Sequence, residues 1–352
     1  MHVPDGFFNA AVSIGAGAFA AAGLAVCLRG ARRELDDRTA PMAGLVAAFI
    51  FAVQMLNFPV AAGTSGHLLG GTLAAVLVGP YTAVLCVAVV LLVQGFFFAD
   101  GGLTALGVNI TLMAIVTSVV GWAVFRLIVR SAPRSRAAIP VAAFIGAAVS
   151  VPVAAMGFTL LFWIGGTAPI DVSSVAIAMG GVHVLIGLGE GLITALTVSS
   201  VLAVRPDLVY GAKGLKAKLV LRTADGASTE VAGGPAPAPS RSLRPLLIGG
   251  ALVTVLLAGV VSFYASSSPD GLEKVAGDKG LNVNERDHSL GGGPLSDYSV
   301  KGVQDERLSV GVAGVAGVGI TVLAGGAIFY VVRRRNRQGE AEGRLDGDKV
   351  SA

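Results

Sequence analysis

The sequence has 352 residues, of which 54% are hydrophobic and only 14% are charged. Soluble domains carry about 25% charged residues, so this composition argues against a soluble protein. Both cysteines lie within apolar stretches, which excludes a disulfide framework and a cysteine-rich metal site. The net charge of +4 is modest, and its distribution along the chain is more informative than its size.

Apolar segments with the length of membrane spans recur along the whole chain. The first is not a signal peptide, because no Lys or Arg precedes Arg29. The third is short and glycine-rich, so we expect it to be tilted, broken or partly re-entrant. The predicted fold is an all-α polytopic membrane protein, a bundle of about seven spans followed by a C-terminal two-span hairpin. The segments cover residues 7–28, 41–58, 65–79, 82–98, 104–126, 138–164, 174–203, 245–264 and 308–332.

Basic residues concentrate after the first segment, around the end of the fifth, between the seventh and eighth, and after the ninth. Cytoplasmic loops are enriched in Lys and Arg, so this pattern predicts nine spans with the N-terminus outside and the C-terminus inside. An eight-span chain would place one arginine cluster on the wrong side. The five basic residues outside these clusters all lie in the loop between the last two spans: Lys274, Lys279, Arg286, Lys301 and Arg307.

An Ala/Pro-rich stretch at 224–243 divides the chain and predicts a flexible to semi-rigid linker. We therefore expect a membrane domain at 1–205, a cytoplasmic loop and linker at 206–244, and a two-span domain at 245–332. The outward loop of that second domain covers 265–307. A basic and then polar cytoplasmic tail follows at 333–352.

Polar side chains within the spans mark faces that point into the protein rather than to lipid. Gln54 and Asn57 are three residues apart, which predicts one helix face, and Gln94 and Asn109 lie in the fourth and fifth spans. Asp100, in the turn between those spans, is expected to cap the helix that follows. Four glycines of the ninth span form a stripe that predicts helix packing: Gly311, Gly314, Gly317 and Gly319.

His183, Glu190 and Thr194 share one face of the seventh span. One interpretation is a network that orders nearby loops or couples to a partner. The other is hydrogen bonding between helices, typically worth about 0.6 kcal/mol per bond, and we favour it for Glu190 and Thr194. A role of His183 as a direct metal ligand stays open as a minor alternative.

His2 lies beside the terminal amine, and His67 follows a glycine-rich loop. The amine of Met1, the amide nitrogen of His2 and its imidazole can close two fused chelate rings on one ion, and His67 can supply a fourth nitrogen. A plane of four nitrogens suits Ni²⁺ and the related Co²⁺. The alternative is a disordered His2 and a His67 that caps or packs a helix. Asp5 can act as an outer partner through an imidazole N–H or backbone amides, or as a turn residue; Ser65 is a similar candidate.

Three motifs make residues 1–205 resemble the substrate-binding membrane component of cobalt/nickel energy-coupling-factor transporters, the CbiM/NikM type. They are MHVPDGFF at the start, QMLNFPVAAGTSGHLLGG at 54–71 and HVLIGLGEGLIT at 183–194. The resemblance implies that Met1, His2 and His67 hold the metal ion. Ni²⁺ or Co²⁺ would be the transported substrate, and cobalt would supply cobalamin biosynthesis.

Residues 245–332 are similar to the small two-span accessory subunit of the same transporters, in the variant marked by the motif Pro269-Asp270-Gly271-Leu272-Glu273. The chain is therefore expected to be a fusion of a CbiM/NikM-type and a CbiN/NikN-like PDGLE domain in the plasma membrane. His288, in the same loop, is expected to be a solvated histidine rather than one that delivers metal.

The sequence contains no G-x-x-x-x-G-K-[ST] phosphate loop and no catalytic constellation, so we expect a transport component rather than an enzyme. The resemblance implies a transmembrane coupling subunit (CbiQ/NikQ-like) and cytoplasmic ATPases (CbiO/NikO-like) as partners, besides the lipid bilayer. The basic clusters lack interleaved aromatics and do not suggest nucleic acid.

Two alternatives remain at this point. The first is a binding component for an organic, vitamin-like solute, with Gln54, Asn57, Gln94 and Asn109 lining its pocket. The second is an intramembrane enzyme that uses His183 and Glu190. The sequence does not decide between cobalt and nickel.

Overall fold

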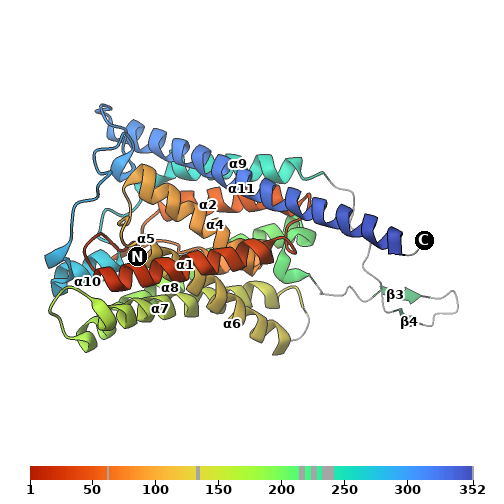
Figure 1. The fold of residues 1–352 in the computed structure, drawn as a ribbon, viewed down its shortest axis with the longest axis horizontal. Helices are drawn as coiled ribbons and strands as arrows, with labels where there is room; N and C mark the ends of the chain where they lie inside the picture. Colours follow the sequence, from red (N-terminus) through yellow and green to blue (C-terminus); the bar gives the residue numbers. More distant parts are fainter. Residues whose placement is uncertain (62, 132–134, 214–218, 223–227, 232–241, 351–352) are drawn as a thin grey trace.

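The computed structural model describes residues 1–61, 63–131, 135–213, 219–222, 228–231 and 242–350. Six helical stretches are long and apolar enough to cross a membrane, and most lie along one long axis (Figure 1). The protein is therefore a multi-pass membrane protein. The six are α1 (Ala10–Ala31), α4 with η1 (Pro80–Val93, Gln94–Phe98), α5 with η2 and α6 (Leu106–Asn109, Ile110–Val116, Thr117–Ser131), α7 (Ala138–Gly165), α8 (Val172–Val204) and α11 (Glu306–Val350).

Shorter elements complete the molecule. Helices α2 (Thr39–Gln54) and α9 (Arg244–Gly259) are apolar, α3 (Gly71–Val78) has eight residues, and α10 (Gly271–Lys279) belongs to the loop before α11. Two antiparallel strand pairs join β1 (Phe58–Pro59) to β2 (Ser65–Gly66) and β3 (Leu219–Arg222) to β4 (Ser228–Val231). Single turns of 3₁₀ helix are η3 (Pro206–Leu208), η4 (Tyr210–Ala212), η5 (Val261–Tyr264), η6 (Leu281–Asn284) and η7 (Ser296–Tyr298).

Helix boundaries follow local capping chemistry. Asn9 accepts a hydrogen bond from the amide of Val12 at the start of α1, and Asp171 accepts one from Ser174 at the start of α8. Helix α4 begins with Pro80, whose missing N–H costs nothing in the first turn. The first turn of α4 is also held by Glu34, which accepts the Thr82 amide at 2.7 Å.

The third predicted span is a broken one. Only Gly71–Val78 is helical, about 12 Å of rise, against the roughly 30 Å of a bilayer core. Before it, Ser65–Gly66 form strand β2 and residues 67–70 are irregular. Gly70 makes the transition with a φ of +87°, and a side chain there would approach Ile50 to 2.8 Å. A helix throughout 65–79 was therefore not possible, and the non-helical part needs hydrogen-bond partners from neighbouring helices.

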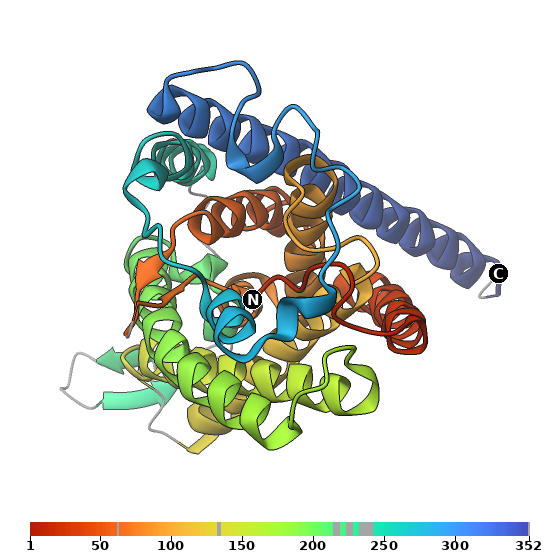
Figure 2. The ribbon, with the colours of Figure 1, turned by 90° about the vertical axis from the view of Figure 1, so that its left-hand side faces the viewer.

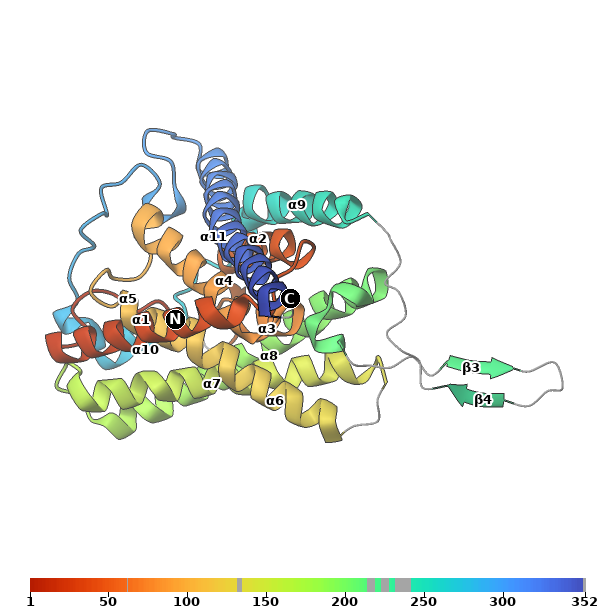
Figure 3. The same ribbon diagram turned by 45° about the vertical axis from the view of Figure 1, so that its right-hand side comes forward.

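Helices α9 and α11 pack against each other and against α2, on one side of the bundle (Figure 3). The predicted glycine stripe makes these contacts possible. A side chain at Gly314 would meet the carbonyl oxygen of Ala258 at 2.1 Å, and one at Gly317 would meet Phe51 at 2.1 Å. Gly319 has open space beside it, so the packing prediction holds only for the earlier part of the stripe.

One local prediction was wrong. Asn57 does not share a helix face with Gln54, because α2 ends at Gln54 and Asn57 lies in the following loop. Strand β3 precedes the predicted linker at 224–243 and pairs with β4 within it, and this hairpin projects beyond the helices (Figure 3). The rest of the proline-rich stretch, 232–241, lies outside the described residues.

The two ends of the molecule differ in character. At one end, Arg333 of α11 pairs with Asp37 of the loop between α1 and α2, and Arg205 pairs with Asp207 at 2.7 Å. At the other end, the N-terminal segment lies inside the ring of helices, with α10 in front of it (Figure 2). The segments that precede α1, α3, α5 and α11 meet at this second end.

Candidate metal site

The first residues enter the molecule as an extended segment. Val3 is fully buried, and Asn109 binds both its polar backbone groups: Oδ1 accepts from the Val3 amide at 2.8 Å, and Nδ2 donates to its carbonyl at 3.2 Å. The Gly102 amide donates to the same carbonyl. A side chain at Gly102 would meet the Asp5 amide nitrogen at 2.2 Å, so only glycine permits this approach.

Asp5 fixes the turn that follows. Its carboxylate accepts from the amides of Leu103 and Thr104 and from the Thr104 hydroxyl, while its carbonyl accepts from the amide of Arg286. Of the two predicted outer-partner roles, binding backbone amides is the one observed. Asp5 thereby joins the N-terminal segment to the loop before α5. It also joins this segment to the loop between α9 and α11; α9, α11 and this loop are called the accessory hairpin from here on.

The terminal amine and His67 meet in a buried place. The Met1 nitrogen lies 2.6 Å from His67 Nε2, and the two residues are 3% and 5% exposed. His67 Nδ1 lies 3.1 Å from the Leu68 carbonyl. With its proton on Nδ1, the ring donates a hydrogen bond to this carbonyl, and the lone pair of Nε2 is then directed at the amine. Two residues far apart in sequence thus present two nitrogens to one point.

His2 stacks on His67, with ring centroids 5.1 Å apart and an angle of 21° between the rings. Its Nε2 lies 3.0 Å from Gln94 Oε1, and its Nδ1 lies 3.3 Å from Asp100 Oδ1. Burial lowers the pKa of His2 to about 4, although Asp100 acts in the opposite direction. His2 is therefore a neutral imidazole near pH 7, the form that binds metal.

The loop between His67 and α3 is held by α8. Glu190 accepts from the amides of Leu69 and Gly70 at 2.7 and 3.1 Å, and Gln54 donates to the Leu69 carbonyl. The interpretation favoured for Glu190, hydrogen bonding between helices, was wrong, because its oxygens order this loop. Thr194 has no hydrogen-bond partner for its hydroxyl in the described part of the chain.

His183 is buried close to these donors and lines one small pocket with Met1 and His67. Its Nδ1 lies 2.8 Å from the Met179 carbonyl, and its Nε2 has no partner among the described residues. The ring lies beside Gly271 of α10, where an added Cβ would approach His183 Cε1 to 3.1 Å. His183 and Glu190 use different partners, so they do not form an acid–base pair.

Sequence reasoning missed Asp270 of the accessory hairpin. Its Oδ2 accepts from the Met1 amine at 2.6 Å and lies 3.4 Å from His67 Nε2. Burial alone would raise the pKa of Asp270, but the neighbouring ammonium and His67 hold it well below its usual range. Ser65 strengthens the junction, since its amide donates to the Pro269 carbonyl and its hydroxyl to that of Ser268. The sequence feature that could have pointed to Asp270 is the PDGLE motif, in which it is the second residue.

Asp100 was also assigned wrongly. It does not cap the following helix; it faces His2 and accepts a 2.5 Å hydrogen bond from the Tyr298 hydroxyl. Burial, together with the charge of Asp100, raises the pKa of that hydroxyl well above its usual value. Asp100 and Tyr298 therefore link the site to the last part of the accessory loop.

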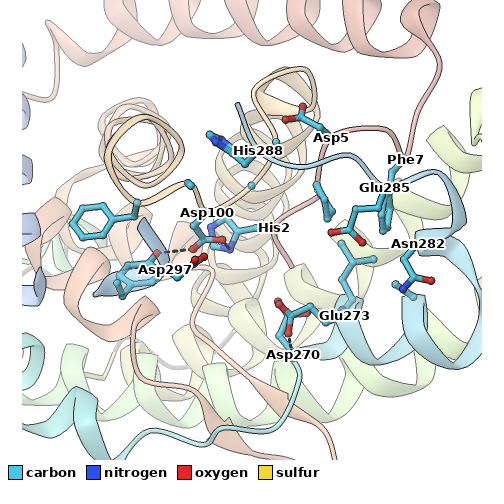
Figure 4. A pocket seen from close by; sticks show the side chains of 18 of the residues that line it. His2, Asp5, Phe7, Asp100, Asp270, Glu273, Asn282, Glu285, His288 and Asp297 are labelled. Carbon is cyan, nitrogen blue, oxygen red and sulfur yellow. Dashed lines mark hydrogen bonds and ion pairs between the residues drawn. The ribbon is translucent and has the colours of Figure 1, made fainter. Parts of the chain in front are cut away.

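A cavity of about 810 Å³ lies over these residues. In Figure 4, the carboxylates of Asp100, Asp270, Glu273 and Glu285 border it together with His2. Gln54, Asn57 and the half-buried His288 also line it. No group of three or more His, Cys, Asp or Glu residues is arranged to hold a metal within the described residues. The predicted donors differ from such a group, since two of the four are backbone nitrogens.

Comparison with known proteins agrees with these features. Residues 2–208 match the family described as the cobalt uptake substrate-specific transmembrane region (CbiM), and residues 244–334 match the PDGLE domain. A protein of Archaeoglobus fulgidus, named as a fused nickel transport protein (NikMN), is 34% identical over 95% of this chain and 99% of its own length.

Two further relatives each cover more than half of this chain. A cobalt transport protein CbiM of Sorangium cellulosum is 37% identical over 56% of this chain and 85% of its own length. The crystal structure of a truncated transition metal transporter superposes with a TM-score of 0.52 at 28% identity, covering 58% of this chain and 99% of that one. The chain therefore belongs to the CbiM family of cobalt uptake transmembrane regions and carries a PDGLE domain at its C-terminal side.

Proposed function

We propose that this chain is the substrate-capture component of an energy-coupling-factor importer for Ni²⁺ or Co²⁺. The ion is bound at the outer face by the Met1 amine, the His2 amide and imidazole, and His67 Nε2. On binding, His2 Nδ1 exchanges Asp100 for the ion, and Nε2 keeps Gln94. Residues 1–205 form the metal-binding domain, and residues 245–332 form the accessory domain.

The observation that carries this proposal is the buried approach of the Met1 amine to His67 Nε2, at 2.6 Å. Neighbouring nitrogens around one ion lie about 3 Å apart when each bond is about 2.1 Å. The two atoms therefore need only a small shift to bind one ion. The two nitrogens are brought together from opposite parts of the first domain in a buried place, and this convergence favours a site for an ion.

The position of this site supports the predicted orientation, with the N-terminus outside. The C-terminal ends of α1, α6, α8 and α11, where the basic clusters occur in the sequence, lie at the far end from this site (Figure 1), as expected for the cytoplasmic side. ATP hydrolysis and its coupling to transport are then supplied by separate subunits, a CbiQ/NikQ-like coupling subunit and CbiO/NikO-like ATPases. This chain contributes capture and release. The ion would supply cobalamin biosynthesis where it is cobalt.

An organic solute fits the cavity less well. Only Gln54 and Asn57, of the four polar residues expected to line such a pocket, border it. Gln94 and Asn109 instead bind His2 and the Val3 backbone. The carboxylates around the cavity favour a cation over an acidic vitamin.

Calorimetry of the purified chain with its native N-terminus tests the proposal. We expect one Ni²⁺ or Co²⁺ per chain. His2→Ala removes the imidazole that closes the second chelate ring, and His67→Ala removes the fourth nitrogen, so each should abolish stoichiometric binding.

His288→Ala is the matched control, because it removes a cavity-lining imidazole outside the four donors and should leave binding intact. Stoichiometric binding in His2→Ala would exclude the terminal chelate. Absence of binding by the native chain would favour the organic solute.

A further inference from the structure

We propose that the carboxylate of Asp270 is a fifth ligand of the transported ion, supplied by the accessory hairpin. This inference rests on the proposed function and adds a donor to the same site. Asp270 Oδ2 would bind on one face of the nitrogen plane. The PDGLE domain would then complete the coordination sphere directly, in addition to packing against the membrane domain.

The distances around Asp270 Oδ2 carry the proposal. It lies 2.6 Å from the Met1 nitrogen and 3.4 Å from His67 Nε2, and those two nitrogens are 2.6 Å apart. Three donors at right angles around an ion, with bonds of about 2.1 Å, form a triangle with edges of about 3 Å. Two of the observed distances are shorter than this value, at 2.6 Å, and the third is longer, at 3.4 Å. All three atoms can therefore reach one ion after shifts of a few tenths of an ångström.

The carboxylate is held in this place by the backbone around it. Its other oxygen, Oδ1, accepts from the amides of Leu272 and Glu273 and caps α10. Two hydrogen bonds from Ser65 hold the residues just before Asp270 against the loop that carries His67. One oxygen thus fixes the side chain, and the other is directed at the metal donors. This arrangement is that of a pre-organised ligand.

Charge balance favours a carboxylate that stays in place when the ion binds. Met1, His67 and Asp270 are 3%, 5% and 7% exposed, and a buried charge needs a partner. In the metal-free state, the ammonium and the carboxylate cancel. A divalent ion displaces one proton from the amine and one from the His2 amide. The ion, the amide anion and the carboxylate then cancel again, whereas loss of Asp270 would leave one positive charge buried.

An apical oxygen changes which ions the site accepts. A plane of four nitrogens alone suits Ni²⁺. A carboxylate above the plane produces a five-coordinate site, which Co²⁺ also accepts. The accessory domain would therefore adjust the preference between the two ions as well as the affinity.

Asp270→Asn tests the proposal, since asparagine caps a helix as well as aspartate does but is a poor, uncharged ligand. We expect the Kd for Ni²⁺ and Co²⁺ to rise at least about tenfold. We also expect the ligand-field absorption of bound Ni²⁺ and the electron paramagnetic resonance spectrum of bound Co²⁺ to change. Asp270→Ser, a second capping residue without a carboxylate, should behave in the same way if the asparagine variant folds poorly.

Asp278→Asn is the control, because it removes one negative charge from the same helix at a side chain that is exposed and paired with Lys274. Its affinity and spectra should match the native chain. Unchanged affinity and spectra in Asp270→Asn, or tighter binding, would show that Asp270 is no ligand while leaving the four-nitrogen site intact. A native chain that binds no metal would instead overturn both proposals.

Discussion

His2 illustrates how much the surroundings decide about one side chain. The sequence offers a histidine beside the terminal amine, but its ring is positioned by Gln94, Asp100 and the stacked ring of His67. Burial keeps this ring neutral without metal. The imidazole is therefore ready to bind, and its neutrality makes the stability of the metal-free protein depend on pH.

We expect the metal-free protein to lose stability as the pH falls from about 6.5 towards 4. The pKa of His2 is lowered to about 4 by burial, so below pH 6.5 the unfolded chain binds a proton that the native chain excludes. The free energy of unfolding is therefore highest above pH 6.5, and at pH 5 it is lower by about 2 kcal/mol. Thermal unfolding midpoints in detergent at about pH 7.5 and pH 5 measure it.

His2→Gln is the comparison for this experiment, because glutamine cannot take up the proton. Its midpoint should fall less between the two pH values than that of the native chain. Equal falls for both proteins would assign the pH dependence to other groups.

Among the elements, the broken third span has the largest effect on the site. An unbroken helix would carry His67 on its own surface. The loop before α3 instead brings His67 to the amine and leaves the amides of Leu69 and Gly70 without helical partners. Glu190 of α8 supplies those partners. Helix α8 therefore positions the loop that carries His67 through a carboxylate that is not among the four proposed donors.

Glu190→Gln should weaken metal binding about 10- to 100-fold, as loss of an outer partner does. Glutamine keeps one acceptor oxygen but turns an NH₂ group towards the second amide, so one of the two bonds is lost. Titration of the purified protein with Ni²⁺ measures the change. Thr194→Val, one turn further along the same face, should have little effect, because this hydroxyl has no partner in the described part of the chain. Equal affinities of the Gln variant and the native chain would limit Glu190 to a role in folding.

Much of this architecture could be predicted from the sequence, and the failures have a common physical origin. Apolar length and arginine clusters predict the helices and place His2 and His67 at one end. Asp270 and Glu190 could not be assigned, because their partners are more than 100 residues away and depend on how helices pack. In the sequence, Asp100 stands just before a helix and therefore resembles a helix cap. In the structure its carboxylate instead accepts a hydrogen bond from Tyr298, a residue of the distant accessory loop.

For the whole molecule, the accessory hairpin and the bundle form one packed unit. Helix α11 lies against α9 at Gly314 and against α2 at Gly317, and the loop before it contacts Asp5, Ser65 and Asp100. These contacts are distributed along the full height of the molecule. Association should therefore not depend on the covalent connection.

We expect the two parts to stay together after cleavage of a protease site inserted within 232–241. Apolar packing of α9 and α11 on α2 would hold them. Co-purification through a tag on the C-terminus, followed by Ni²⁺ titration, measures both association and function. Uncleaved protein carrying the same insertion is the control. Separation of the two parts in detergent would show that the linker is needed for assembly.

The contact between Met1 and Asp270 also bears on how the protein is made. Met1 can make this contact only after residues near position 270 have been synthesised and have reached the same side of the membrane as Met1. During that interval the N-terminal segment has none of its accessory-loop contacts. This contact therefore forms late in synthesis, and it requires that the loop after α9 and the N-terminal segment lie on the same side of the membrane.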